Sequence, residues 1–154
     1  MSFNARQVIL GPGEGPMVRV PGHPYAVKAS TDDTGGAYAL AEATITGEGP
    51  PQHIHRAGEE AFYVLEGQVD VLVGDQTVHG TAGTFVLIPR GTVHTFWNAG
   101  STPARLLVII SPPGVEKYLA EIIGDEDIDA AEFVERMTAQ GHKLDMEVVG
   151  PPLG

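Results

Sequence analysis

The stretch GEGPPQHIHRAGEEAFYVLEG, residues 47–67, places two histidines and a glutamate pair in a segment rich in strand-forming residues. His53 and His55 are separated by one residue. Residues two apart on an extended strand point to the same side, so both imidazoles can bind one ion, whereas a helix would need a spacing of four. These two histidines are therefore candidate metal ligands.

The glutamate pair supplies a third candidate ligand. Glu60 shares a strand face with Phe62 and Val64, so we expect its carboxylate to point into the interior. Glu59 is the alternative, but it has the opposite parity and should face outward or lie in the turn. We therefore prefer Glu60.

A second stretch, GTFVLIPRGTVHTFWN, residues 83–98, adds a fourth candidate ligand. Its Pro-Arg-Gly turn leads to His94 at the start of a new strand. Three neutral imidazoles and one carboxylate suit a divalent ion of Fe, Mn, Ni, Co, Cu or Zn, and leave open positions if the ion is five- or six-coordinate. We predict one such ion and leave its identity open.

Short strand-like segments surround these stretches, bounded by Gly, Pro, Asn or Asp. The turns in LEGQV and VGDQT are typical of hairpins. Many short strands without intervening helices favour an all-β sandwich or barrel. The expected strands are Tyr25–Ala29, Ala37–Ile45, Glu60–Leu65, Gln68–Val73, Gln76–His79, Thr84–Ile88, His94–Asn98 and Ala104–Ile110, with a further short one around Val18 to Val20.

The pattern changes after SPPG, where apolar residues recur with helical spacing from Val115 to Ile123 and end at Gly124. A second helix is predicted from Asp129, which has a capping-box spacing to Glu132, to a stop at Gly141. We expect these two short helices to cap one side of the barrel or to take part in a dimer contact. The tail from Lys143 alternates apolar residues and should lie as an extended arm on a neighbouring surface.

The chain of 154 residues is predicted to be one domain: an N-terminal arm (1–24), a β-barrel (25–112) and C-terminal helices and tail (113–154). Without cysteine, no disulfide or thiolate-rich metal site can form. A net charge of −11 with scattered cations argues against a nucleic-acid partner. No segment is apolar and long enough for a signal peptide or a membrane span, so we expect a cytoplasmic protein.

In these two stretches the chain resembles the cupin family, which is defined by the motifs G-x5-H-x-H-x3,4-E-x6-G and G-x5-P-x-G-x2-H-x3-N. All ten specified positions match, with fifteen residues between the two motifs. The variable spacing before Glu leaves Glu59 possible, but only Glu60 also satisfies the gap to the last glycine of the first motif. The matching positions are Gly47, His53, His55, Glu60, Gly67, Gly83, Pro89, Gly91, His94 and Asn98.

The rest of the chain is more loosely similar to single-domain cupins described as quercetin-dioxygenase-like. The resemblance implies a jelly-roll barrel, a metal near its mouth and a homodimer. It also suggests a metal-dependent dioxygenase acting on a small aromatic or enolisable compound, with Glu60 as general base. The alternatives are a cyclase, decarboxylase or isomerase that uses the metal as a Lewis acid, and a non-catalytic small-ligand-binding protein.

Aromatic residues are candidates for a substrate pocket. The simplest interpretation of Tyr38, Phe62, Phe85, Phe96 and Trp97 is packing in the core or in a dimer contact. Phe62 and Phe96 also share the parity of the ligands, and with Tyr38 they are the candidates to line the pocket. Trp97 has the opposite parity and should pack outside the barrel. The remaining histidines, His23, His79 and His142, are interpreted as surface or structural residues.

Overall fold

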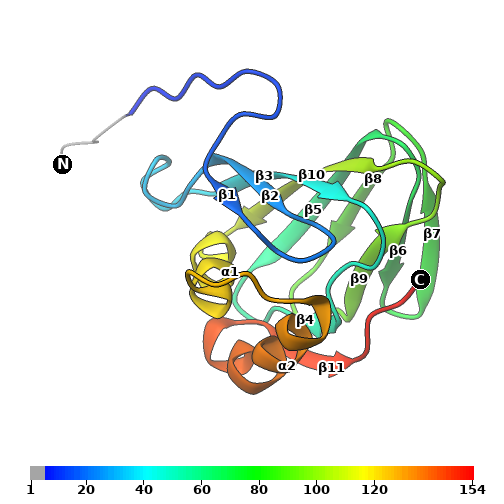
Figure 1. The fold of residues 1–154 in the computed structure, drawn as a ribbon. Helices are drawn as coiled ribbons and strands as arrows, with labels where there is room; N and C mark the ends of the chain where they lie inside the picture. Colours follow the sequence, from blue (N-terminus) through cyan, green and yellow to red (C-terminus); the bar gives the residue numbers. More distant parts are fainter. Residues whose placement is uncertain (1–5) are drawn as a thin grey trace.

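The computed structural model describes residues 6–154, which form two antiparallel β-sheets with the helices gathered at one end (Figure 1). This confirms the predicted all-β jelly-roll barrel with two short C-terminal helices. The elements are β1 (Met17–Val18), β2 (Tyr25–Ala29), β3 (Ala39–Ile45), β4 (Gln52–Ile54), β5 (Glu59–Glu66), β6 (Val69–Val73), β7 (Gln76–Gly80), β8 (Phe85–Ile88), β9 (His94–Asn98), β10 (Ala104–Ser111), α1 (Val115–Ile123), α2 (Ala130–Gln140), the 3-10 turn η1 (Gly141–Leu144) and β11 (Glu147–Gly150).

The chain crosses repeatedly between the two sheets. One sheet has the strand order β1-β2-β3-β10-β5-β8, and the other has the order β11-β4-β9-β6-β7. Strands β4 and β5 follow one another in sequence but lie in different sheets, as do β9 and β10. The short connection from β4 to β5, residues 55–58, therefore joins the two sheets at one end of the barrel, with His53 just before it, His55 at its start and Glu60 just after it.

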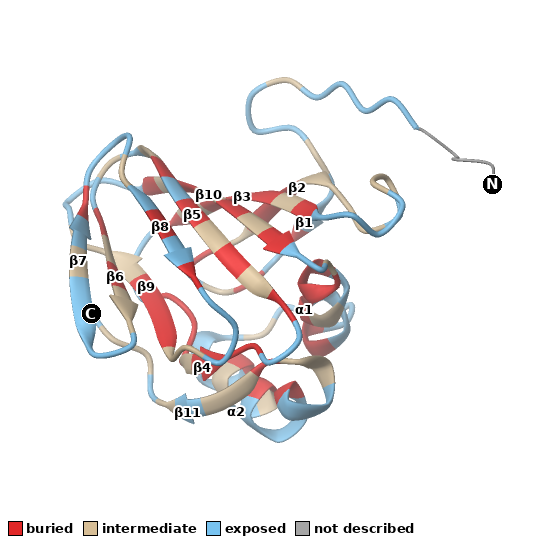
Figure 2. Cartoon of the chain, turned by 180° about the vertical axis from the view of Figure 1, so that it is seen from behind, coloured by how far each residue is buried: buried red, intermediate tan, exposed pale blue. Residues whose placement is uncertain are grey.

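The core lies between the two sheets and follows strand parity. In β10, Ala104, Leu106, Val108 and Ile110 are buried while the residues between them are only partly so. Figure 2 shows the same alternation of buried and less buried residues along β5. Burial of these apolar side chains drives the two sheets together and fixes which residues point inward.

The predicted strands are all present, with ends shifted by no more than two residues. The tail is extended only from Glu147, because Lys143 and Leu144, where the extended arm was predicted to start, belong to η1. It lies on its own barrel: β11 pairs antiparallel with β4, and Val148 lies opposite His53. The side chain of Gln52 strengthens this contact by donating a hydrogen bond to the Pro151 carbonyl at 2.9 Å. The last strand of the chain therefore borders the histidine pair.

The two helices form where the apolar spacing predicts them. Helix α1 buries Val115, Leu119 and Ile122. Helix α2 is capped by Asp129, whose carboxylate accepts a hydrogen bond from the Glu132 N–H at 2.8 Å. Figure 1 shows both helices together at the end of the sheets near β4 and β11. No helix within residues 6–154 has the length and apolar character needed to cross a bilayer.

Candidate metal centre

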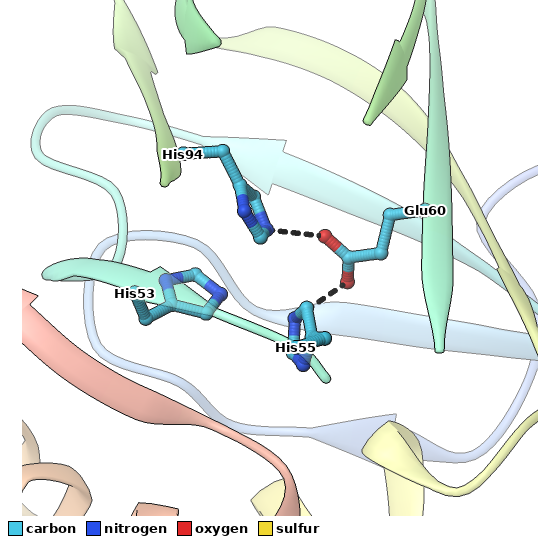
Figure 3. Close-up of side chains that lie close together, drawn as sticks. All are labelled: His53, His55, Glu60 and His94. Carbon is cyan, nitrogen blue, oxygen red and sulfur yellow. Dashed lines mark hydrogen bonds and ion pairs between the residues drawn. The ribbon is translucent and has the colours of Figure 1, made fainter. Parts of the chain in front are cut away.

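Three strands bring the four predicted ligands together at one end of the barrel. His53 in β4 lies opposite His94 in β9, His55 follows β4 directly, and Glu60 enters from β5 in the other sheet. One potential ligand atom from each residue lies within 4.8 Å of those of the other three. Figure 3 shows the imidazoles and the carboxylate turned toward a common centre. The cluster could therefore hold one metal ion.

All four side chains are buried: the residues are between 1% and 6% exposed. The Nε2 atom of His94 lies 2.9 Å from Glu60 Oε2, and His55 Nε2 lies 3.4 Å from Glu60 Oε1. The ring centroids of His53 and His94 are 4.3 Å apart. Buried polar groups require partners, so this concentration of them inside an apolar barrel calls for a ligand or a specific hydrogen-bond network.

Main-chain carbonyls fix the orientation of all three imidazoles. His53 Nδ1 lies 2.7 Å from the Pro51 carbonyl oxygen, and His94 Nδ1 lies 2.9 Å from that of Thr92. A carbonyl oxygen only accepts hydrogen bonds, so each Nδ1 carries the proton. His55 has the same arrangement with a carbonyl from the C-terminal segment. Each Nε2 therefore faces the centre, where it can coordinate an ion once it carries no proton, which is how a second contact commonly orients a metal-ligating histidine.

The charges in the cluster are strongly coupled. Burial tends to raise the pKa of Glu60, but the neighbouring His55 and His94 outweigh it and hold that pKa well below its usual value. For His55, burial acts to lower the pKa, and the charge of Glu60 more than compensates, so the pKa is raised. Burial, followed by repulsion from His94 and His55, holds the pKa of His53 well below its usual value. Glu60 is thus ionised, and the cluster attracts a cation.

The donor set and the geometry fit a divalent ion. The buried His55 Nε2 has no hydrogen-bond partner. It faces the other three cluster residues, so a cation at their centre would provide the missing partner. Three imidazole nitrogens and one carboxylate oxygen match the preferences of Zn and of first-row transition metals. The cluster therefore fits a mononuclear centre held by His53, His55, Glu60 and His94.

The motif residues Gly91 and Asn98, and Gly49 between two motif positions, pack or hydrogen-bond around the strands of the cluster. The N–H of Gly91 donates to the His55 carbonyl at 2.7 Å, which ties the Pro-Arg-Gly turn to the histidine pair. The Asn98 amide donates to the carbonyls of Ile45 and Thr102 at 2.9 and 2.7 Å. A Cβ at Gly49 would collide with the Phe96 carbonyl oxygen. These contacts hold the ligand-bearing strands in place.

A small apolar cavity adjoins Glu60 beneath α1. Its volume is about 20 Å³, enough for one water-sized group. Tyr25 lies in its wall, and burial, helped by the Glu60 charge, raises the pKa of its phenol, which stays protonated. Glu116 also lines the cavity and accepts a hydrogen bond from the Thr31 N–H at 2.7 Å. The remaining lining residues are Val18, Ala41, Val108, Ile110, Val115 and Leu119.

The aromatic residues expected to line a pocket lie elsewhere. Phe62 and Phe96 are 1% and 2% exposed and pack edge to face at 5.4 Å between ring centroids, with Phe62 next to His94. Tyr38 is 44% exposed just before β3 and borders a surface hollow formed with the N-terminal segment. Its strand parity points outward, so the structure leaves it outside the cluster. Sequence reasoning missed Tyr25, whose inward parity in β2 was the available signal.

The other histidines stay apart from the cluster, and so does Glu59, which is half-buried. His23 is buried among the rings of Tyr25, Phe96 and Phe133. His79 lies on the β6–β7 hairpin, with its Nδ1 2.6 Å from Asp70. His142 is exposed in η1, and Trp97 is half-buried beside Gly154.

Comparison with known proteins identifies relatives of this barrel. The cupin domain family matches residues 44–110. An uncharacterized protein of Streptomyces coelicolor is 33% identical over 51% of this chain and 69% of its own length. Quercetin 2,3-dioxygenase of Bacillus subtilis is 28% identical over 76% of this chain, which spans 34% of that enzyme.

A solved structure gives the same result at the level of the fold. The polyketide cyclase RemF from Streptomyces resistomycificus superposes with a TM-score of 0.58 at 26% identity, covering 68% of this chain and 79% of that one. The two-sheet barrel, the two motifs and these matches lead to one conclusion: the chain belongs to the cupin superfamily.

Proposed function

We propose that this protein is a metal-dependent dioxygenase that acts on a small phenolic or enolisable compound. The observation that carries the proposal is the double position of Glu60, which is one of the four cluster residues and also lines the apolar cavity. The same residue thus borders both the place where an ion fits and the cavity where a substrate oxygen would fit.

The four cluster residues would hold one divalent ion of Fe, Mn, Ni, Co, Cu or Zn. When bound, such an ion favours the ionised form of a substrate hydroxyl and, if redox-active, provides one-electron chemistry toward O2. The protein's own part is to place a base, to exclude water and to position the substrate oxygen.

Glu60 is the proposed general base. Its Oε2 and Oε1 atoms lie 2.9 and 3.4 Å from the Nε2 atoms of His94 and His55, and its low pKa keeps it ionised. So weak a base would accept a proton only from a hydroxyl that the bound ion has made strongly acidic. Tyr25 keeps its proton and can donate a hydrogen bond to a substrate oxygen in the cavity. The apolar residues of α1 exclude water from this space.

The size of the cavity limits what enters it. A space of about 20 Å³ holds a hydroxyl-sized group, whereas an aromatic ring needs more room. We expect α1 to move outward when substrate binds, since its apolar residues form part of the cavity wall. The flanking residues Gly114 and Gly124 both have positive φ, at 144° and 67°, and mark the ends of this helix.

A second candidate function keeps the metal and omits O2. The similarity to the polyketide cyclase RemF favours a cyclase, isomerase or decarboxylase in which an enolate is stabilised. The same base and the same cavity serve either reaction. The distinguishing property is whether turnover consumes O2.

The test begins with elemental analysis of the purified protein, followed by O2 uptake with a flavonol and by anaerobic turnover of a 1,3-dicarbonyl. We expect Glu60→Gln to lower kcat by roughly 10²–10⁴-fold, as for loss of a general base. Glu59→Gln, one residue away and outside the cluster, is the matched control and should retain activity. Anaerobic turnover without O2 uptake would select the second candidate. A metal-loaded protein inactive in both assays would instead indicate a ligand-binding protein.

A further inference from the structure

Asp145 has an unusual backbone conformation at the junction of η1 and β11. Its φ is 59°, and it is the only non-glycine residue with positive φ within residues 6–154. This left-handed region is unfavourable for most side chains and is tolerated best by Gly, Asn and Asp. Surrounding contacts must therefore hold the residue there.

The Asp145 N–H donates to the Gly141 carbonyl within η1, whereas its carbonyl and its carboxylate contact the cluster residue His55 and the turn that follows it. Its main-chain carbonyl oxygen lies 2.5 Å from His55 Nδ1. Its carboxylate accepts hydrogen bonds from the N–H groups of Arg56 at 2.7 Å, Ala57 at 3.0 Å and Gly58 at 3.2 Å. One residue thus orients a ligand histidine and holds the turn that leads from it toward Glu60.

His55 differs from the other two histidines in how far along the chain its carbonyl partner lies. His53 and His94 each donate to a carbonyl two residues earlier in the chain, so their strands orient them locally. His55 donates to a carbonyl 90 residues later. The orientation of His55 therefore depends on the C-terminal segment being in place.

Other contacts hold residues 141–150 against the cluster. Met146 is 1% exposed, and its N–H donates to the Gly141 carbonyl at 2.7 Å. A Cβ at Gly141 would collide with the Met146 carbonyl oxygen, so this tight approach needs glycine. Arg56 forms an ion pair with Glu147 at 2.9 Å.

We propose that Asp145 is a positioning residue of the metal centre, and that bound metal and the segment 141–150 stabilise each other. This inference rests on the proposed metal-binding function. The Asp145 carbonyl holds a proton on His55 Nδ1 and leaves Nε2 for the ion. The Asp145 carboxylate fixes the conformation of the turn between His55 and Glu60. Contacts of this kind commonly change metal affinity by about 10–100-fold when they are lost.

The test uses Co²⁺ as the probe, because its visible absorption reports the ligands as well as the affinity. We expect Asp145→Ala to weaken Co²⁺ binding by about 10–100-fold and to change the absorption spectrum. Asp145→Asn keeps an acceptor oxygen and tolerates positive φ, so it should restore most of the affinity. Asp75→Ala, in the exposed β6–β7 turn, is the matched control.

Amide hydrogen exchange provides a second readout, which does not depend on any enzymatic activity. In the wild-type protein, Co²⁺ should slow exchange of the amides in residues 145–150, and Asp145→Ala should abolish this protection. If Asp145→Ala fails to fold, Asp145→Gly carries the test, because it permits positive φ and retains the carbonyl but lacks the carboxylate.

The outcomes separate the two hypotheses. A wild-type protein that binds no Co²⁺ overturns the proposed metal function and this inference with it. A wild-type protein that binds Co²⁺, together with Asp145 variants whose Kd and spectrum match it, overturns the inference alone. Weaker binding in Asp145→Ala with recovery in Asp145→Asn supports it.

Discussion

Two regions of this barrel bring a histidine close to a carboxylate, and the difference between them lies in the nitrogen used and in burial. On the β6–β7 hairpin, His79 Nδ1 lies 2.6 Å from Asp70, and the two side chains are 56% and 24% exposed. In the cluster, His94 Nε2 lies 2.9 Å from Glu60, and the side chains are 1% and 7% exposed. Distance alone does not separate them. The cluster differs because its Nδ1 atoms already donate to carbonyls, so every Nε2 faces a buried centre.

Removing a ligand should have the largest effect. Replacing His94 by Ala takes one imidazole from the cluster, and we expect metal affinity to fall by more than about 100-fold, beyond the loss expected for a supporting contact. Replacing His79 by Ala should leave metal content unchanged, since its nitrogens face Asp70 and solvent. Elemental analysis of both variants and the wild type checks this. Equal metal in all three would refute the assignment.

Acid should weaken metal binding at the cluster, because protons compete for the same nitrogens. Burial acts to lower the pKa of His55, but Glu60 raises it overall, so the proton on this ring competes with the metal up to a higher pH than the proton of a free histidine does. Affinity should rise with pH by about tenfold per pH unit for each proton released, and level off only above that raised pKa. Competition with a chelator at several pH values measures it. Constant affinity between about pH 5 and 8 would contradict histidine ligation.

His23 shows how burial changes the pKa of a histidine that has no carboxylate partner. Burial lowers its pKa from 6.5 to about 3, so between these values the unfolded chain takes up a proton that the folded protein does not. Stability conferred by the neutral ring is therefore present above about pH 6.5 and lost as pH falls toward 3, by about 1.4 kcal/mol per pH unit. His23→Phe should remove this part of the acid sensitivity. Urea unfolding of variant and wild type at pH 7, 6 and 5 measures the difference, and parallel curves would be the contrary result.

The exposed pair should have the smallest effect. A histidine and carboxylate near solvent contribute at most about 1 kcal/mol to the free energy of unfolding. His79→Ala should therefore change stability by less than that, with part of the change removed by salt. Urea unfolding at low and high salt checks this. A larger, salt-independent loss would show that the hairpin pair has a structural role of its own.

Much of the fold could be predicted from local patterns. Strand parity predicted that Glu60 rather than Glu59 points inward, and helical spacing predicted α1 with its end at Gly124. These features depend on neighbours in sequence, so the local pattern is sufficient. The clustering of the four candidate ligands was predicted because the spacing of residues along each strand agreed with the two cupin motifs.

The features that were missed depend on contacts between distant residues. Asp145 has no local pattern that points to His55, because the pairing of β11 with β4 determines their contact. Tyr25 reaches the cavity because β2 packs in the sheet that carries Glu60. Tyr38 was expected in the pocket, but it precedes β3 on its outward side. The homodimer and the cytoplasmic location stay predictions.

The distant carbonyl of Asp145 has a consequence for the order of events during synthesis. Translation proceeds from the N-terminus, so all four cluster residues leave the ribosome before residue 145 does. A nascent chain that ends earlier would contain the imidazoles without the group that orients His55. We therefore expect metal loading to be a late step of maturation, completed only when the last strand has docked against β4.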